Sequence, residues 1–292
     1  LHASRLPLHA IDALAVAHGP GLIGSLLVGV ETAKTLAWVW PASQRGEQKP
    51  LIPINHLIGH FYANWITEHP RGEKKRLHLG GEIPKFPCIG LLVSGGHTDL
   101  VLFQNHGKYI YLGGTRDDAA GECFDKCARL LGLPYPGGPE ISILTANGKD
   151  IYKLPRPMID SDDFDFSFSG LKTAVANLVR AKGGSDLPNL AASIEAAIVD
   201  VLVSKTIAAV QKYKVEQIMV AGGVASNLRL ISDLQFKISN LKLKIKVAVP
   251  TPSLCTDNAA MIAAAAFFQK SIKNPHMLQA DPNLSLNTHP KP

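Results

Sequence analysis

The sequence lacks the features of a secreted or membrane-bound chain. No apolar run reaches the roughly 18 residues that a membrane-spanning helix needs, and no secretory signal opens the chain. It has only four cysteines, and none forms a Cys-x-x-Cys pair. Cys123 and Cys127 stand four apart in a segment with helical periodicity, so both are expected to face a core as small apolar groups. These absences favour a reducing cytoplasm and no membrane association.

Charge is scarce as well. Only 18% of the residues are charged, against 46% hydrophobic, which excludes a disordered chain and predicts a globular one. A length of 292 residues favours two domains or two lobes. Basic residues outnumber acidic ones, with a formal net charge of +6. This excess permits an anionic partner such as RNA without requiring one.

Apolar strands and helices are expected to alternate along the chain. This alternation predicts an α/β architecture with two similar lobes, in which ligands lie beyond the carboxyl ends of strands. Strands are expected at 11–17, 51–54, 88–93, 98–103, 109–112, 217–221 and 244–249. Helices are expected at 26–40 with Ser25 as N-cap, after 54, at 117–131, up to 147, after 166–172, at 187–213, after 227 and at 258–268.

Three glycine-rich turns each follow an apolar strand, at residues 19–25, 94–97 and 222–227. Glycines let backbone N–H groups approach an anion closely, and a following helix N-terminus adds positive potential. None of the three matches the Gly-x-Gly-x-x-Gly fingerprint or a P-loop, and one such turn alone is a weak signal. Three of them at strand ends in one chain indicate a nucleotide cleft between the lobes.

His56 and His60 are the strongest candidates for a metal site. If their segment is helical, a spacing of four places both imidazoles on one face, where they can share a metal ion. Taken alone, such a pair is more often a half-buried helix face, and no Glu follows His56 as in zinc peptidases. Asp257 is the candidate third ligand, and this set suits Zn²⁺ or Fe²⁺. Asp257 could instead cap the following helix, unless Thr256 does.

Other polar residues have two interpretations each. Asp125 could bind ribose hydroxyls with its carboxylate, or form a solvated pair with Lys126. His97, which ends the turn at 94–97, could be an acid or base or only a turn residue. A basic cluster lies in an expected exposed loop, where an RNA contact and a solvated loop are about equally favoured: Arg71, Lys74, Lys75 and Arg76.

Eight motifs in order resemble one family. The resemblance runs from about residue 11 to residue 268 and is far more specific than any single motif. The motifs are Gly19-Pro-Gly-Leu-Ile-Gly-Ser-Leu-Leu-Val-Gly29, Asn55-His-Leu-Ile-Gly-His60, Leu92-Val-Ser-Gly-Gly-His-Thr98, Asp118-Ala-Ala-Gly-Glu-Cys-Phe-Asp-Lys126, Tyr135-Pro-Gly-Gly-Pro139, Asp165-Phe-Ser-Phe-Ser-Gly-Leu-Lys172, Ala221-Gly-Gly-Val-Ala-Ser-Asn227 and Cys255-Thr-Asp-Asn-Ala-Ala-Met-Ile-Ala263. This set resembles the TsaD family, the bacterial tRNA N6-adenosine threonylcarbamoyltransferases, also called the glycoprotease family.

The resemblance implies an actin-like, sugar-kinase-like fold with two similar lobes around a central nucleotide cleft. Residues 1–88 are then expected to be the remainder of the N-terminal lobe with the metal-binding helix. Residues 89–268 would hold the nucleotide-binding remainder and the C-terminal lobe, and 269–292 a loose tail.

The resemblance also implies site residues. The metal ligands would be His56, His60 and Asp257, holding one divalent ion, Fe²⁺ in the first place and Zn²⁺ as the alternative. The catalytic candidate remains His97. Substrate contacts would come from Leu92, Val93, Ser94, Gly95, Gly96, Asp125, Gly138 and Asn227.

The implied reaction moves a threonylcarbamoyl group from threonylcarbamoyl-AMP to N6 of adenosine 37 in tRNAs that read codons starting with A. The implied partners are tRNA, a TsaB-like pseudoenzyme and a TsaE-like ATPase, while a TsaC-type synthase makes the intermediate. Three alternatives stand beside it: an actin-like small-molecule kinase or ATPase, an inactive scaffold of the same complex, and, last, a peptidase.

Two departures from the family pattern bear on these expectations. Leu92 and His97 stand where archaeal and eukaryotic relatives carry Tyr and Asn, which favours the bacterial or organellar branch. The family also begins with a strand and a Glu-Thr-Ser-Cys-Asp-like turn upstream of the position of Leu1, and that segment is absent here. We therefore expect the sequence either to be a fragment or to lack one wall of the active site.

Overall fold

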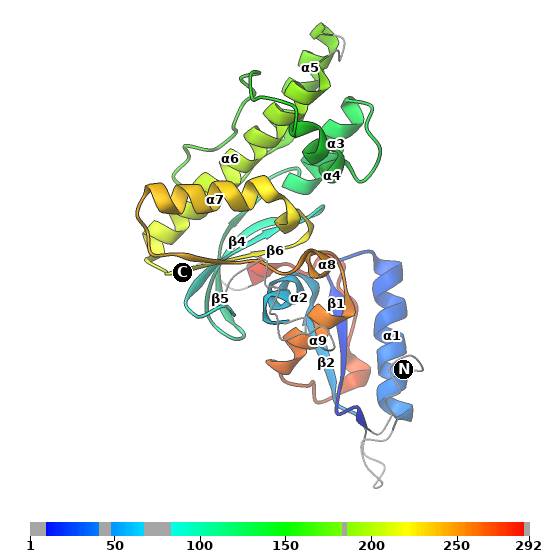
Figure 1. Cartoon of the computed structure of the whole chain (residues 1–292). Helices are drawn as coiled ribbons and strands as arrows, with labels where there is room; N and C mark the ends of the chain where they lie inside the picture. Colours follow the sequence, from blue (N-terminus) through cyan, green and yellow to red (C-terminus); the bar gives the residue numbers. More distant parts are fainter. Residues whose placement is uncertain (1–9, 41–47, 67–82, 183–185, 289–292) are drawn as a thin grey trace, which may run out of the picture. The chain divides into compact units, whose positions relative to one another are not determined.

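The computed structural model describes residues 10–40, 48–66, 83–182 and 186–288 (Figure 1). The chain divides into two compact units. Unit 1 comprises Leu1–Ile66 and Asp257–Pro290, and unit 2 comprises Thr67–Thr256 with the last two residues. These divisions differ from the expected boundaries at 88 and 268, because the chain returns to unit 1 at Asp257. No helix in the described ranges is long and apolar enough to cross a membrane.

Unit 1 contains a two-stranded parallel sheet, in which β1 (Leu14–Gly19) pairs with β2 (Leu51–Asn55). The connecting helix α1 (Ile23–Val39) packs on this pair (Figure 1). Ser25 was expected as its N-cap, which is wrong. The turn ends at Gly21 with a φ of 151°, so Leu22 is extended and the helix already begins at Ile23.

Three further helical segments of unit 1 follow. The first, α2 (His56–Tyr62), begins directly after β2 and continues into the 3-10 turn η2 (Ala63–Trp65). After the return, α9 (Ala259–Phe267) packs against α2. The sequence predicted a helix at both places, and the expected ends of the second, 258 and 268, each lie one residue outside those of α9.

The segment after α9 is not a loose tail, contrary to expectation. It contains the short turns η4 (Pro275–Met277) and η5 (Leu286–Thr288), and both Leu278 and Leu286 are buried. Ile272 N–H donates to the carbonyl of Leu51, which anchors the segment to β2. Its prolines and asparagines therefore shape a packed irregular segment rather than a free end.

Unit 2 is built on a five-stranded sheet with the order β5-β4-β3-β6-β7. The hairpin strands β3 (Cys88–Val93), β4 (Thr98–Asn105) and β5 (Lys108–Gly114) are antiparallel, as predicted. Strands β6 (Gln217–Ala221) and β7 (Lys246–Ala248) continue the sheet in parallel with β3. Because β3 and β6 are parallel neighbours, the glycine turns that follow them lie at one edge of the sheet.

Helices complete unit 2. The long helix α6 (Leu187–Tyr213) matches its prediction, and α7 (Leu228–Asn240) packs against it (Figure 1). The others are α3 (Ala120–Leu130), α4 (Gly137–Thr145), α5 (Ser169–Lys182), the 3-10 turn η3 (Gly223–Ser226) and α8 (Pro252–Cys255). A loop was expected where α8 forms one helical turn, because Pro252 occupies the first helical position, which proline favours.

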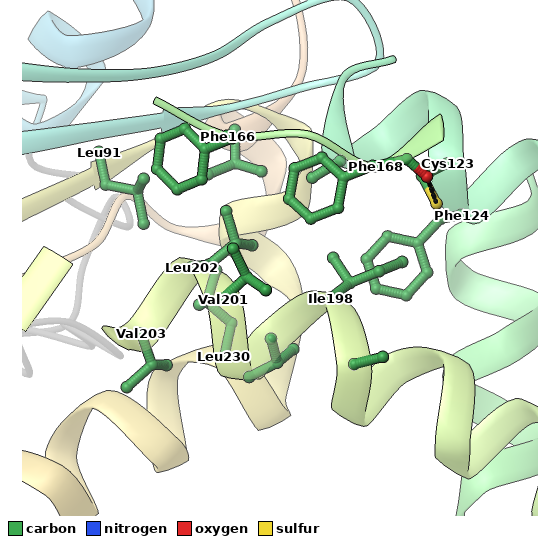
Figure 2. Close-up of a cluster of buried hydrophobic side chains, with 14 of the residues drawn as sticks. Leu91, Cys123, Phe124, Phe166, Phe168, Ile198, Val201, Leu202, Val203 and Leu230 are labelled. Carbon is green, nitrogen blue, oxygen red and sulfur yellow. Dashed lines mark hydrogen bonds between the residues drawn. The ribbon is translucent and has the colours of Figure 1, made fainter. Parts of the chain in front are cut away.

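The core of unit 2 lies between the sheet and these helices. Figure 2 shows Phe166 and Phe168 above α6 residues such as Val201 and Leu202, all of them buried. Cys123 belongs to this core, and its thiol lies 3.7 Å from the carbonyl of Phe168. Cys123 and Cys127 are both fully buried and not disulfide-bonded, which confirms their prediction as core groups.

Candidate functional site

The histidine pair lies at the start of α2. Asn55 caps this helix, because its side-chain oxygen accepts a 2.9 Å hydrogen bond from Leu57 N–H. His56 is then the first helical residue and His60 follows one turn later, so both imidazoles leave one face, with ring centroids 4.8 Å apart. His60 is 3% exposed, whereas His56 is half-buried.

Asp257 reaches both imidazoles. Its Oδ1 lies 3.3 Å from His56 Nε2 and 3.2 Å from His60 Nε2. The alternative role of Asp257 as a helix cap is wrong, because Asn258 caps α9 by accepting from Met261 N–H at 2.8 Å. Hydrogen bonds to His56 and then His60 hold the pKa of Asp257 far below its usual range. The carboxylate therefore stays ionised beside the two imidazoles.

Close packing of α2 on α9 produces this convergence. Gly59 lies between the two histidines, and a Cβ there would come within 2.7 Å of the Ile262 side chain. An alanine here would require the end of the Ile262 side chain to move, because Ile262 Cδ1 is its nearest neighbour. Gly59 therefore allows α2 to pack closely on α9 beside the candidate metal ligands.

The donor set fits a divalent transition metal. One atom from each of His56, His60 and Asp257 can be chosen so that all three lie within 4.8 Å of one another. Two imidazoles and one carboxylate suit Zn²⁺ or Fe²⁺ and leave coordination positions open. The side chain of Asp257 is 76% exposed, so this side is accessible. Among the described residues the buried Nδ1 of His60 has no hydrogen-bond partner, although metal-bound histidines usually donate from that nitrogen.

The turn after β3 presents backbone rather than side chains. Leu92 and Val93 are fully buried in β3, so neither is exposed to a ligand, and their predicted substrate contacts stay predictions. Ser94 N–H donates to the carbonyl of His97 at 2.8 Å, and Ser94 Oγ accepts from His97 N–H at 3.2 Å, which closes the turn. The other two residues, Gly95 and Gly96, are exposed, and a Cβ on either would meet only open space. Room therefore exists for a ligand over their amides.

Two glycines hold neighbouring elements against this turn. A Cβ on Gly121 of α3 would lie 2.5 Å from the carbonyl oxygen of Ser94. One on Gly222, which follows β6 with a φ of 90°, would lie 2.4 Å from the carbonyl oxygen of Val93. The backbones thus approach as closely as glycine alone allows. They bring the start of α3 and the turn before α7 to the edge of the sheet where the Ser94 turn lies.

Asp125 is held by the next helix of the chain. Its Oδ1 accepts a 2.7 Å hydrogen bond from Gly137 N–H at the start of α4, beside the half-buried Gly138. The alternative of a solvated Asp125–Lys126 pair is wrong. Lys126 Nζ instead lies 2.6 Å from Asp118 and 2.9 Å from Glu122. Asp125 is thus fixed in orientation with a second carboxylate oxygen that could accept from a ligand.

Asn227 is fixed by residues that the sequence analysis missed. Its Oδ1 accepts from Leu230 N–H at 2.9 Å and so caps α7. Its amide donates to Ser142 Oγ at 3.1 Å and to Glu195 Oε1 at 2.7 Å. Glu195 is 3% exposed, in the middle of α6. The signal was available, because a lone acidic residue within the apolar run 190–199 requires a buried polar partner.

The roles expected for His97 and for the basic cluster are left as predictions. His97 is half-buried, and its backbone closes the Ser94 turn, so a turn role is present and an acid–base role stays a prediction. The basic cluster of Arg71, Lys74, Lys75 and Arg76 lies outside the described residues.

The sequence profile of TsaD, tRNA N6-adenosine threonylcarbamoyltransferase, matches residues 1–264. The chain belongs to the TsaD family. A Dehalococcoides mccartyi protein named tRNA N6-adenosine threonylcarbamoyltransferase is 49% identical to this chain. The match covers 92% of this chain and 74% of that protein. A protein of the same name in Staphylococcus saprophyticus is 47% identical, over 92% of this chain and 73% of its own length. Another in Anoxybacillus flavithermus is 44% identical, over 97% of this chain and 78% of its own length.

Solved structures place this TsaD-family chain in the actin-like fold class. HypF from T. kodakarensis superposes with a TM-score of 0.58 at 13% identity, over 88% of this chain and 41% of its own. A full-length HypF in a phosphate- and nucleotide-bound form gives a TM-score of 0.53 at 12% identity, over 75% of this chain and 42% of its own. At these identities the likeness concerns the fold alone. The fold class expected from the motifs is thereby confirmed.

Proposed function

We propose that this chain transfers a threonylcarbamoyl group to N6 of adenosine in tRNA. The observation that carries the proposal is the convergence of His56, His60 and Asp257 in a chain of the TsaD family. The donor is threonylcarbamoyl-AMP, and the target is adenosine 37 of tRNAs that read codons starting with A. The reaction forms a carbamoyl–N6 bond and releases AMP.

The residues of unit 1 would hold one divalent metal, Fe²⁺ in the first place and Zn²⁺ as the alternative. When bound, the ion supplies Lewis acidity that polarises the carbonyl under attack. Asp257 contributes a carboxylate that remains ionised, and the burial of His60 fixes the direction of its imidazole. Rigid placement of the three donors reduces the cost of organising the site before reaction.

The residues of unit 2 would bind the nucleotide part of the donor. The amides of the open Gly95–Gly96 turn can donate to phosphate oxygens, as glycine turns at strand ends do. The carboxylate of Asp125 is oriented by Gly137 and can accept from ribose hydroxyls. Asn227 and Gly138 would also contact the nucleotide. His97 remains a candidate for proton transfer. A tRNA substrate, a TsaB-like protein, a TsaE-like protein and a cytoplasmic location belong to the same proposal.

The test compares metal content and tRNA modification in His60→Ala and wild type, loaded with Fe²⁺ or Zn²⁺ and supplied with threonylcarbamoyl-AMP, unmodified tRNA and the two partner proteins. The variant should lose the metal and at least a hundredfold of the rate, whereas His276→Ala, which changes an exposed histidine of unit 1, should keep both. Near-normal modification by His60→Ala with metal still bound would refute the site. Phosphoryl transfer from ATP to a small sugar or acetate, without tRNA modification, would instead support a kinase.

A further inference from the structure

Six lysines gather at one end of unit 2, where α6 and α7 end and β6 and β7 begin (Figure 1). All six are exposed. They form what we call the lysine surface: Lys212, Lys214, Lys237, Lys242, Lys244 and Lys246.

Several contacts bring these residues together. Lys246 is the register partner of Gln217, and its N–H donates to the carbonyl of Glu216 at 3.0 Å, so β7 begins beside the start of β6. Lys214 ends α6 in the left-handed conformation and lines the same shallow hollow as Lys244. The lysine surface is therefore centred on Lys214, Lys244 and Lys246, while Lys212 Nζ lies over the Phe164 ring, 5.0 Å from its centroid.

Most of the net charge of the chain lies here. Residues 211–246 contain seven basic and two acidic residues, a formal charge of +5 within a chain of +6. One acidic residue, Asp233, pairs with Arg229 at 3.3 Å and offsets no lysine. Among the described residues, Lys212, Lys214, Lys237, Lys242 and Lys244 form no ion pair. Glu216 lines the same hollow as Lys214 and Lys244 and offsets part of their charge, so the surface keeps an excess of positive charge.

Helix dipoles explain only part of this arrangement. Lys212 and Lys237 lie in the last turns of α6 and α7, where a cation stabilises the helix. Lys242, Lys244 and Lys246 lie beyond both helices. The intervening Leu243 and Ile245 pack on the core, which turns these three lysines to the other side of the segment. A helix-stabilising role does not account for them.

The spacing of Lys244 and Lys246 suits a phosphate backbone. Lys242 lies in the turn after α7 with a φ of 53°, so only Lys244 and Lys246 can follow the spacing of about 7 Å between alternate residues of an extended chain. This distance is comparable with that between neighbouring phosphates along one strand, so these two lysines can meet successive phosphates while Lys242 adds a third charge beside them. Lysine acts as a flexible point charge and reads no base edges, so the contact would be independent of sequence.

We propose that the lysine surface binds the phosphate backbone of the substrate RNA, away from the nucleoside that is modified. The proposal rests on the proposed function, because it takes the partner to be tRNA. Asn227 caps the start of α7 and Lys242 follows its end, and a helix of 13 residues is roughly 20 Å long. An RNA whose target base lies near Asn227 would thus reach the lysines with a stem of about six nucleotide steps.

The experiment measures the affinity of the full chain for an unmodified tRNA transcript and for a synthetic RNA stem-loop at several KCl concentrations. The variant is Lys242→Gln/Lys244→Gln/Lys246→Gln. Its matched control is Lys149→Gln/Lys153→Gln/Arg180→Gln, which removes three exposed positive charges elsewhere in unit 2. The variant should bind both RNAs about 10- to 100-fold more weakly at low salt, and the slope of log K against log[KCl] should fall by about 2 to 3. The control should resemble wild type.

Equal affinities and slopes for the variant and its control would overturn the proposal. So would unchanged RNA binding with lost binding to polyglutamate, which would assign the surface to an acidic protein instead. His60→Ala separates this inference from the function, because it should bind RNA like wild type while modifying none. If wild type modified no tRNA but the lysine variant still lost RNA affinity, the proposed function would fail and the lysine surface would stand.

Discussion

The buried carboxylate of Glu195 accepts a hydrogen bond of 2.7 Å from the side-chain amide of Asn227. The same oxygen, Oε1, accepts from Ser142 Oγ at 2.8 Å, so one acceptor joins α4, α6 and the start of α7. With its Oδ1 engaged as a helix cap, Asn227 can adopt only one amide orientation. Glu195 is therefore a positioning residue for the proposed nucleotide site.

Replacement of Glu195 should separate positioning from folding. Glu195→Ala removes the shared acceptor of two half-buried donors, Ser142 Oγ and the Asn227 amide, and should lower the free energy of unfolding by about 1–3 kcal/mol. It should also weaken AMP binding several-fold, measured by calorimetry, because Asn227 loses the charged acceptor that holds its amide, although its cap bond to Leu230 N–H remains. Glu195→Gln keeps an acceptor oxygen and should restore most of both. Loss of stability with unchanged AMP affinity in Glu195→Ala would assign Glu195 a structural role alone.

Asp257→Asn should weaken metal binding at least tenfold, because a neutral amide replaces an ionised ligand. In wild type, a metal at 100 times its Kd should raise the free energy of unfolding by about 2.7 kcal/mol. All three tryptophans, Trp38, Trp40 and Trp65, lie in unit 1, so their fluorescence reports the unfolding of the unit that contains the site.

The control for this measurement is Asp12→Asn, which changes an exposed acid of unit 1. It should gain the same metal-induced stability as wild type. Full metal stabilisation in Asp257→Asn would remove Asp257 from the ligand set.

Asp99 predicts a pH dependence in unit 2. Burial raises its pKa to about 6, although Tyr111 donates a 3.1 Å hydrogen bond to its Oδ1. In the unfolded chain the pKa is about 3.9, so the folded state binds more protons between these values. The contribution of Asp99 to stability is then fully present below about pH 4 and is lost as the pH rises through 6.

Asp99→Asn should remove this pH dependence. Between pH 4 and pH 7 the variant should gain about 2–3 kcal/mol relative to wild type, at 1.36 kcal/mol for each unit of pKa difference. Urea denaturation followed by circular dichroism measures it, with the exposed Asp160→Asn as control. A stability difference that is constant with pH would show that Asp99 titrates normally.

The packed segment after α9 predicts a stability effect far from either site. Leu286 is 1% exposed, so Leu286→Ala should lower the free energy of unfolding by about 2–4 kcal/mol. Met277→Ala, at a residue 72% exposed, should cost under 1 kcal/mol. Both are measured by tryptophan fluorescence in urea. Equal stability of the two variants would mean that the segment contributes little to unit 1.

The elements predicted best are those whose burial is continuous. The bounds of β3, β6 and α6 were predicted to the residue, because their apolar runs end abruptly in proline, glycine, serine or a charged residue. Capping was predicted poorly. Ser25 and Asp257 both looked like caps, yet Leu22 and Asn258 hold those positions, because the preceding turn determines which residue becomes extended. Local propensity cannot anticipate that choice.

The candidate site shows the same limit. The spacing of His56 and His60 predicted a shared face, which is a local property of a helix. Their approach to Asp257 depends on α2 packing against α9 across Gly59, which no local pattern encodes. Only the family resemblance suggested it. Glu195 was missed because its partners come from two other helices.

The return of the chain to unit 1 at Asp257 gives the site an order of assembly. Residues Thr67–Thr256 of unit 2 lie in sequence between the two histidines and the carboxylate. During synthesis the imidazole pair can form as soon as α2 folds, but the third donor is made only after residues Thr67–Thr256 of unit 2. The proposed ion would then cross-link segments at the two ends of a very long loop. Metal binding would thus indicate that Asp257 has reached the two histidines of α2.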